Sequence, residues 1–99
     1  MVKHVILWKL NDMPEADCAA VKANIKKHLE ALSGKIPGLL EINVYIDKLD
    51  SSNVDVMLDS SFESEAALKG YAVHPDHVAV ADTYVRPFTA ARSCLDFTV

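Results

Sequence analysis

The sequence predicts an α+β fold in which one antiparallel sheet carries its helices on one face. Three observations predict it. Apolar and polar residues alternate, as in half-buried strands, at both ends and in the middle of the chain. Apolar residues recur at helical spacing in the two stretches between these segments. Clusters of turn-forming residues mark the boundaries, and the 99-residue length suits one domain, expected over residues 1–99.

The opening strand is predicted over residues 2–10, which are rich in β-branched and aromatic side chains. Alternation places the following residues on one face of the strand: Val2, His4, Ile6, Trp8 and Leu10. The opposite face carries Lys3, Val5, Leu7 and Lys9. Because both faces include apolar residues, we expect both to be covered at the centre of the strand.

The first helix is predicted over residues 11–35. Asn11 and Pro14 are typical of a helix start, and Gly34 is typical of a stop. The apolar stripe of this helix consists of Cys18, Val21, Ile25, Leu29 and Leu32. His28 lies at the edge of that stripe, where a surface position is expected.

A hairpin is predicted next, with strands over residues 39–48 and 54–63. Both segments alternate apolar with mostly polar residues, and a turn cluster at 49–53 separates them. We therefore expect a half-buried antiparallel pair.

The second helical stretch is predicted to break at Pro75. Ser64 is a suitable N-cap for a helix over residues 64–73. Pro75 disfavours helical backbone at His74, and it fits the first turn of another helix over residues 75–85. His74 is therefore expected to be a turn residue.

The final strand is predicted over residues 91–99, after Pro87 ends the helical stretch. The order β-α-β-β-α-β is that of a ferredoxin-like fold with an antiparallel sheet. Helices would cover one face of the sheet. The other face also carries apolar residues, and the same face of a second copy is its simplest cover. We therefore expect a homodimer, in keeping with a mean hydropathy of +0.11.

The composition argues against several classes of function. The net charge is −4 and only Lys26-Lys27 forms a basic pair, whereas nucleic-acid binding needs a basic face. No apolar run is long enough for a membrane span or a signal peptide, so we expect a cytoplasmic protein with no membrane or nucleic-acid partner. Cys18 and Cys94 match no zinc or redox spacing and are expected to be free thiols.

The segment GYAVHPDHVAV, residues 70–80, carries the candidate catalytic residues, Tyr71 and His77. Histidine titrates near neutrality and can act as a general base. A tyrosine hydroxyl can donate a hydrogen bond to a developing enolate oxygen. Together they suit deprotonation next to a carbonyl. Structural roles stay open for both, as a packed aromatic ring and as a core or capping histidine.

Further groups are expected to meet this pair between the helices and the sheet. Helical spacing places His77, Ala81, Tyr84 and Phe88 on one face. The candidate substrate-binding residues are His4, His28, Trp8 and Tyr84. A metal site on His74 and His77 would lack a third ligand at suitable spacing, so no metal is predicted.

Four segments resemble the Dabb family, the stress-responsive dimeric α/β-barrel domain: VKHVILWKL, IPGL, YAVHPDHVAVADTY and the late DF. The resemblance covers residues 2–98. It implies a ferredoxin-like subunit, a homodimer whose sheets close into a dimeric α/β barrel, and no obligatory cofactor. One plant member closes and aromatises a linear polyketide, and its catalytic tyrosine and histidine match Tyr71 and His77. Its strand histidine matches His4, whereas a tyrosine lining its pocket falls on His28.

The sequence leaves two hypotheses about function. One is a stress-responsive domain of unassigned activity, a homodimer whose pocket could hold a small apolar or phenolic ligand. The alternative is a cofactor-independent polyketide cyclase or lyase that uses Tyr71 and His77 for acid–base catalysis. An enzyme needs an open cavity of roughly a few hundred Å³. Trp8 and its neighbours on the His4 face favour a small or closed one.

Overall fold

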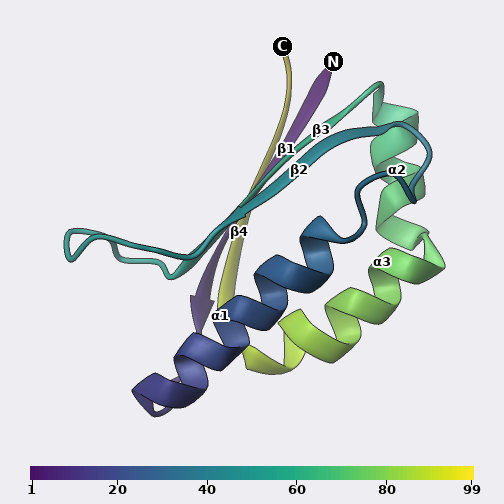
Figure 1. The fold of residues 1–99 in the computed structure, drawn as a ribbon. Helices are drawn as coiled ribbons and strands as arrows, with labels where there is room; N and C mark the ends of the chain where they lie inside the picture. The colour runs from purple at the N-terminus through teal and green to yellow at the C-terminus, as the bar shows by residue number, and fades with distance from the viewer.

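Strands and helices follow the predicted order along residues 1–99, all of which the computed structural model describes (Figure 1). The strands are β1 (Val2–Leu10), β2 (Leu39–Tyr45), β3 (Val56–Phe62) and β4 (Thr89–Thr98). The helices are α1 (Glu15–Glu30), α2 (Glu65–Val73) and α3 (Pro75–Val80). After α3 the chain continues through a π-helical turn, η1 (Ala81–Val85), and a 3-10 turn, η2 (Arg86–Phe88), before β4 begins.

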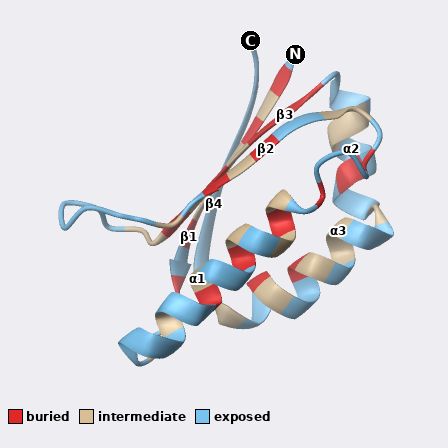
Figure 2. Ribbon diagram, viewed as in Figure 1, coloured by how far each residue is buried: buried red, intermediate tan, exposed pale blue.

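The strands form one antiparallel sheet in the order β2-β3-β1-β4, so the first and last strands lie side by side. In β1 the residues of the face that carries His4 are all buried, and those of the opposite face are partly or fully exposed (Figure 2). The structure confirms the predicted ferredoxin-like α+β architecture with an antiparallel sheet. The alternation predicted for β1 is also confirmed, but the centre of its other face, which was expected to be covered, is only partly buried within one copy of the chain.

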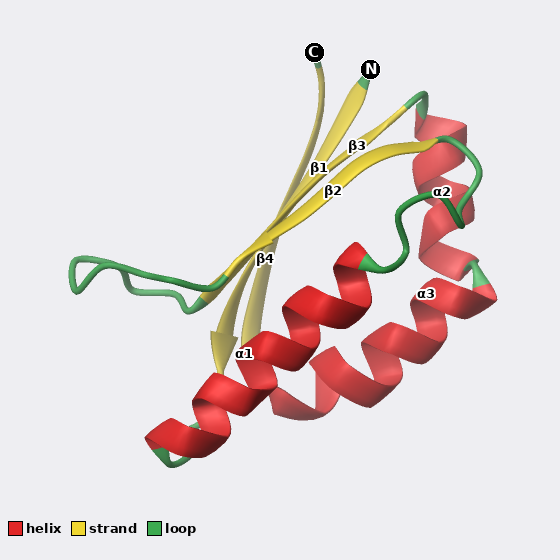
Figure 3. Ribbon diagram, viewed as in Figure 1, coloured by secondary structure: helices red, strands yellow, loops and turns green.

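The helices gather on one face of the sheet (Figure 3). Ile25 and Leu29 of α1 are almost fully buried and belong to one core with Val44 and Leu58 of the sheet. Burial of each such side chain contributes about 1.5–3 kcal/mol to stability. This packing fixes α1 over one part of the sheet. Helix α2 contacts β1, β2 and β3, and a cavity lies between α2, α3 and the strands β1 and β4.

The first helix is shorter than predicted at its start. Pro14 has extended backbone (φ −56°, ψ 149°) and occupies the N-cap position, so α1 begins at Glu15. Asn11 donates its backbone N–H to the Phe88 carbonyl (2.8 Å) and its side-chain amide to the Pro87 carbonyl (3.2 Å). Asn11 therefore ties the end of β1 to η2 instead of starting a helix.

The first helix also ends early, at Glu30, and the following turns contain Gly34 and Gly38, both with positive φ (78° and 79°). Gly34 faces open space. A Cβ on Gly38 would lie only 2.5 Å from the Cβ of Ala67 on α2. The absence of a side chain at Gly38 therefore lets the start of β2 pass close to α2.

The remaining strand boundaries differ from prediction by a few residues. The hairpin strands β2 and β3 are shorter because the residues between them leave the sheet as a projecting arm (Figure 1). Asp55 anchors this arm: it accepts from the Leu10 backbone N–H (2.8 Å) and from Lys48 (2.7 Å). Strand β4 starts earlier than predicted, at Thr89, because it pairs with β1 as far as Leu10.

The sheet face away from the helices is not covered by the chain itself. Large apolar residues of β4 and the C-terminus are exposed there, with Leu95 at 63%, Phe97 at 40% and Val99 at 70%. Such an apolar face is typical of an interaction surface. No helix combines the length and apolar character that crossing a membrane requires.

Replacing Gly38 by alanine is expected to destabilise the protein more than the same change at Gly34. Both variants place a Cβ at positive φ, which costs about 1–2 kcal/mol. Only at Gly38 does the new methyl group meet Ala67, and such overpacking costs about 1–3 kcal/mol more. Urea unfolding of the two variants measures the difference. Equal losses would show that the close approach to α2 imposes no constraint.

Candidate active site

The predicted break at Pro75 is present. Helix α2 ends at Val73, His74 has extended backbone (φ −65°, ψ 132°), and Pro75 is the first residue of α3. The His74 backbone N–H donates to the Tyr71 carbonyl (3.1 Å), and its Nδ1 accepts from the Asp76 backbone N–H (3.1 Å). His74 is therefore a turn residue that caps α3.

Across this break, Tyr71 and His77 lie against each other. Their ring centroids are 4.0 Å apart and the rings are inclined by 34°. Tyr71 is only 1% exposed, and its ring also packs on Phe62 at a centroid distance of 5.0 Å. The Tyr71 hydroxyl and the His77 Nδ1 are buried and have no hydrogen-bond partner. Buried polar groups normally have partners, so two unpartnered polar atoms on neighbouring rings are unusual.

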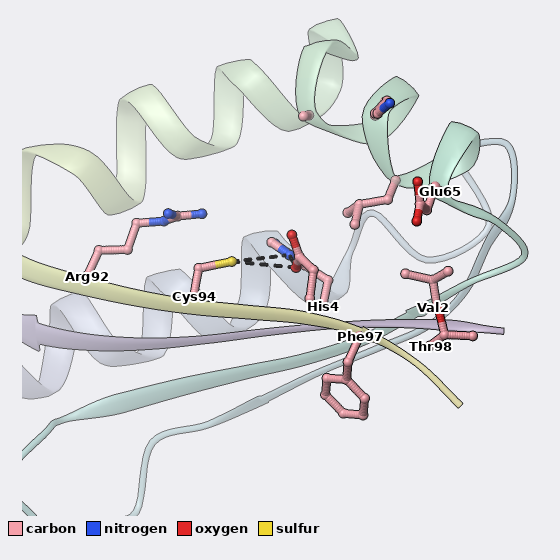
Figure 4. Close-up of a pocket in the computed structure, with 11 residues that line it drawn as sticks. Val2, His4, Glu65, Arg92, Cys94, Phe97 and Thr98 are labelled. Carbon is pink, nitrogen blue, oxygen red and sulfur yellow. Dashed lines mark hydrogen bonds and ion pairs between the residues drawn. The ribbon is translucent and has the colours of Figure 1, made fainter.

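The pair lines a cavity of about 440 Å³ between α2, α3, η1 and the sheet. The cavity wall contributed by β1 consists of His4, Ile6 and Trp8. A second hollow of about 670 Å³ adjoins it along β4 (Figure 4). The two hollows share His4, Leu68, Ala72 and Arg92. Trp8 forms part of the wall rather than filling the space, so the expectation of a small or closed cavity is wrong.

His4 reaches the cavity from β1 and is held by Asp96 of β4. The His4 Nδ1 lies 2.5 Å from the Asp96 Oδ1. The imidazole is also edge-on to the Tyr71 ring, with centroids 6.1 Å apart. Because a carboxylate only accepts hydrogen bonds, this contact places a proton on the His4 Nδ1. His4 is thus oriented by a carboxylate beside the Tyr71–His77 pair.

Asp96 and Arg92 were not predicted as site residues. Their alternation on the final strand is visible in the sequence, but their place depends on the register of β4 against β1. That register sets Asp96 opposite His4 and Arg92 opposite Trp8. Pairing of the first and last strands, which the predicted fold requires, is the signal that could have found them.

One cluster beside the cavity presents metal-ligand atoms. The His4 Nδ1, the Cys94 Sγ and the Asp96 Oδ1 lie within 4.8 Å of one another. His4 and Asp96 are already bonded to each other. Burial and the neighbouring Asp96 carboxylate raise the pKa of the Cys94 thiol, which disfavours the thiolate that binds metals. The predicted lack of a metal stays a prediction.

His74 and His77, the histidine pair considered as metal ligands, do not converge on one point. His74 caps α3 with its Nδ1, whereas His77 lines the cavity. The turn at Pro75 therefore directs the two imidazole rings to different places.

His28 and Tyr84 are brought together, but away from this cavity. Their rings stack in parallel, with centroids 3.7 Å apart and planes inclined by 5°. The expectation that they meet the Tyr71–His77 pair is wrong. The cause is the π-helical turn, which has more residues per turn than the α-helix assumed in the prediction. As a result, Val85 and not Tyr84 lines the cavity with His77 and Ala81. Tyr84 turns instead toward His28 on α1.

Burial gives the two catalytic candidates different protonation states. Burial lowers the pKa of His77, so its ring is neutral at pH 7 and can accept a proton. Burial also raises the pKa of Tyr71 far above its usual range, so its hydroxyl keeps its proton and can donate a hydrogen bond. The site therefore pairs a base with a donor.

The comparison with protein families agrees with this architecture. The family described as the stress responsive A/B barrel domain, Dabb, matches residues 2–99. The chain belongs to the Dabb family. No curated protein sequence matches this Dabb chain.

Solved structures resemble the Dabb chain over nearly its whole length. A dimeric protein of ferredoxin-like fold and unknown function from Bacteroides fragilis is 31% identical, with 99% of this chain and 95% of that one covered and a TM-score of 0.92. A dimeric ferredoxin-like protein of unknown function from Thermobifida fusca is 25% identical, with coverages of 99% and 90% and a TM-score of 0.82. The hydroxynitrile lyase of Passiflora edulis is 14% identical, with coverages of 99% and 92% and a TM-score of 0.72, a likeness in fold alone.

Removal of the Tyr71 hydroxyl is expected to leave stability unchanged or to increase it, because that hydroxyl has no partner to lose. Ser60→Ala is the matched control, since the buried Ser60 hydroxyl donates to the His4 carbonyl (2.8 Å). That change should cost about 1 kcal/mol. Thermal unfolding of Tyr71→Phe and Ser60→Ala makes the comparison. A loss in Tyr71→Phe as large as that in Ser60→Ala would assign the hydroxyl a structural bond.

Proposed function

We propose that this Dabb protein binds a small carbonyl compound in the cavity and moves a proton at the carbon next to the carbonyl. The observation that supports this is the unsatisfied Tyr71–His77 pair, buried in the wall of a cavity of about 440 Å³. A cavity of that size suits a small organic ligand. Ile6 and Trp8 give it an apolar wall, which favours an apolar or phenolic body for the ligand.

The proposed step needs no cofactor. The neutral His77 ring takes the proton from the carbon, and the electron pair of that C–H bond forms an enolate. The Tyr71 hydroxyl donates a hydrogen bond to the enolate oxygen and so stabilises its charge. The enolate carbon can then attack a second carbonyl carbon and close a ring, and the reverse step cleaves a carbon–carbon bond. The proposed class is therefore a cyclase or lyase.

Burial divides the roles between the two residues. A base must be unprotonated, and burial lowers the pKa of His77 below its ordinary value of 6.5. A donor to an enolate must be protonated, and burial raises the pKa of Tyr71. His4 lines the same wall, and its bond to Asp96 fixes its orientation for contact with the ligand.

The proposed active form is a homodimer in which the open sheet face of one copy covers that of another. Two observations support it. Leu95, Phe97 and Val99 expose apolar surface on that face. The Bacteroides fragilis relative, 31% identical to this chain, is dimeric. Burial of these side chains would stabilise the pair, because each Å² of apolar surface removed from water contributes about 25 cal/mol.

The acid–base proposal predicts that the protein catalyses exchange of the methyl protons of 4-hydroxyacetophenone for deuterium. The exchange is monitored by proton NMR in heavy water. His77→Gln should slow the exchange by at least about 10²-fold, and Tyr71→Phe should slow it by a similar factor. The rate requires neutral His77, whose folded pKa is lowered. The rate should therefore decline, as the pH falls, at a lower pH than it would with a histidine of ordinary pKa 6.5 as the base.

His74→Asn is the matched control for that measurement, because His74 caps α3 and asparagine is also a good N-cap. Its exchange rate should equal that of the wild type. Equal rates in the wild type and in His77→Gln would refute the proposed role of His77.

The homodimer proposal predicts a solution mass of twice 10.9 kDa by light scattering after size exclusion. Leu95→Lys should shift the mass toward the monomer, because it places a charge on the proposed interface. Val73→Lys is the control, since Val73 is exposed at 75% but lies on α2, on the helix side of the sheet. A monomeric wild type at micromolar concentration would overturn the proposal.

A further inference from the structure

The charge around the two hollows differs in sign from that of the whole chain. The chain has a net charge of −4, yet the basic side chains Lys69, Arg86 and Arg92 line the hollows. The only acidic residues among the lining are Glu65 and Asp96, both in the outer hollow along β4. The inner cavity, which holds Tyr71 and His77, has two arginines and no acidic side chain. An anionic group on a ligand would therefore be favoured there.

The three basic side chains are not equivalent. Arg86 is bound to Asp82 one turn away in the helical segment. Lys69 is exposed on α2 and lines only the outer hollow. Arg92 lines both hollows and forms no ion pair with a carboxylate. Arg92 is thus the cation with free hydrogen-bonding capacity at the junction of the two hollows.

The fold aims Arg92 into the cleft. It lies opposite Trp8 in the pairing of β4 with β1. Figure 4 shows its side chain rising from β4 on the same side as Cys94, toward the helices, with the guanidinium extended over the hollow. Phe97 points to the opposite side of the strand. A guanidinium presents parallel N–H donors that match both oxygens of a carboxylate.

We infer that the ligand of this cleft carries a carboxylate as well as a carbonyl, and that Arg92 binds the carboxylate while Tyr71 and His77 act at the carbonyl. This inference rests on the proposed function. It assigns a substrate class, aryl or alkyl keto acids, and it makes Arg92 the residue that determines specificity. Trp8 and Ile6 lie along the same cavity and would contact the apolar body between the two ends.

The test uses two probes that share an aryl methyl ketone and differ in charge: 4-acetylbenzoate and its methyl ester. Affinities are measured by titration of nitrogen-15 amide shifts, which also report whether each variant is folded. The wild type should bind the acid at least about tenfold more tightly than the ester, as a charge-assisted bidentate bond provides. Arg92→Gln should bind both probes equally, with the affinity for the ester unchanged.

Arg86→Gln is the matched control, because Arg86 lines the same cavity but is already bound to Asp82. It should keep the preference for the acid. Equal binding of the two probes by the wild type, or a preference that survives Arg92→Gln, would overturn the inference and leave the proposed function intact. Failure of both probes to bind the wild type would overturn both.

Discussion

Pro75 cannot donate a backbone hydrogen bond, and the arrangement of the site depends on the turn that it imposes. In a continuous helix, residues six apart are separated by about 240° around the axis, so Tyr71 and His77 would point in different directions. The extended backbone of His74 redirects the chain instead, and the two rings meet at 4.0 Å. A proline placed between a tyrosine and a histidine thus converts two distant helical positions into one facing pair.

The parts of the structure that depend on local signals could be predicted from the sequence. Alternation in β1 placed His4 on one face with Ile6 and Trp8, and Pro75 identified the break. The π-helical turn could not be predicted, because one wider turn leaves no mark in the apolar spacing, and it moved Tyr84 away from the cavity. Asp96 was missed because its contact with His4 joins residues 92 positions apart.

The site is also costly to maintain. A buried polar group without a partner destabilises a fold by about 1–3 kcal/mol, and the cavity wall holds two such atoms, on Tyr71 and on His77. The core under α1 compensates, since side chains such as Ile25 and Leu29 are almost completely removed from water. The dense half of the domain therefore supports a neighbouring half that is hollow and incompletely satisfied, a distribution common at functional sites.

The side-by-side position of β1 and β4 has a consequence for how the protein is made. One strand contributes His4 and Trp8 to the lining of the two hollows, and the other contributes Arg92 and Asp96. During synthesis the N-terminal half emerges from the ribosome long before its counterpart. Contacts of such large sequence separation form late and slow folding. Because β4 supplies part of the lining, the two hollows are completed only when the last strand pairs with the first.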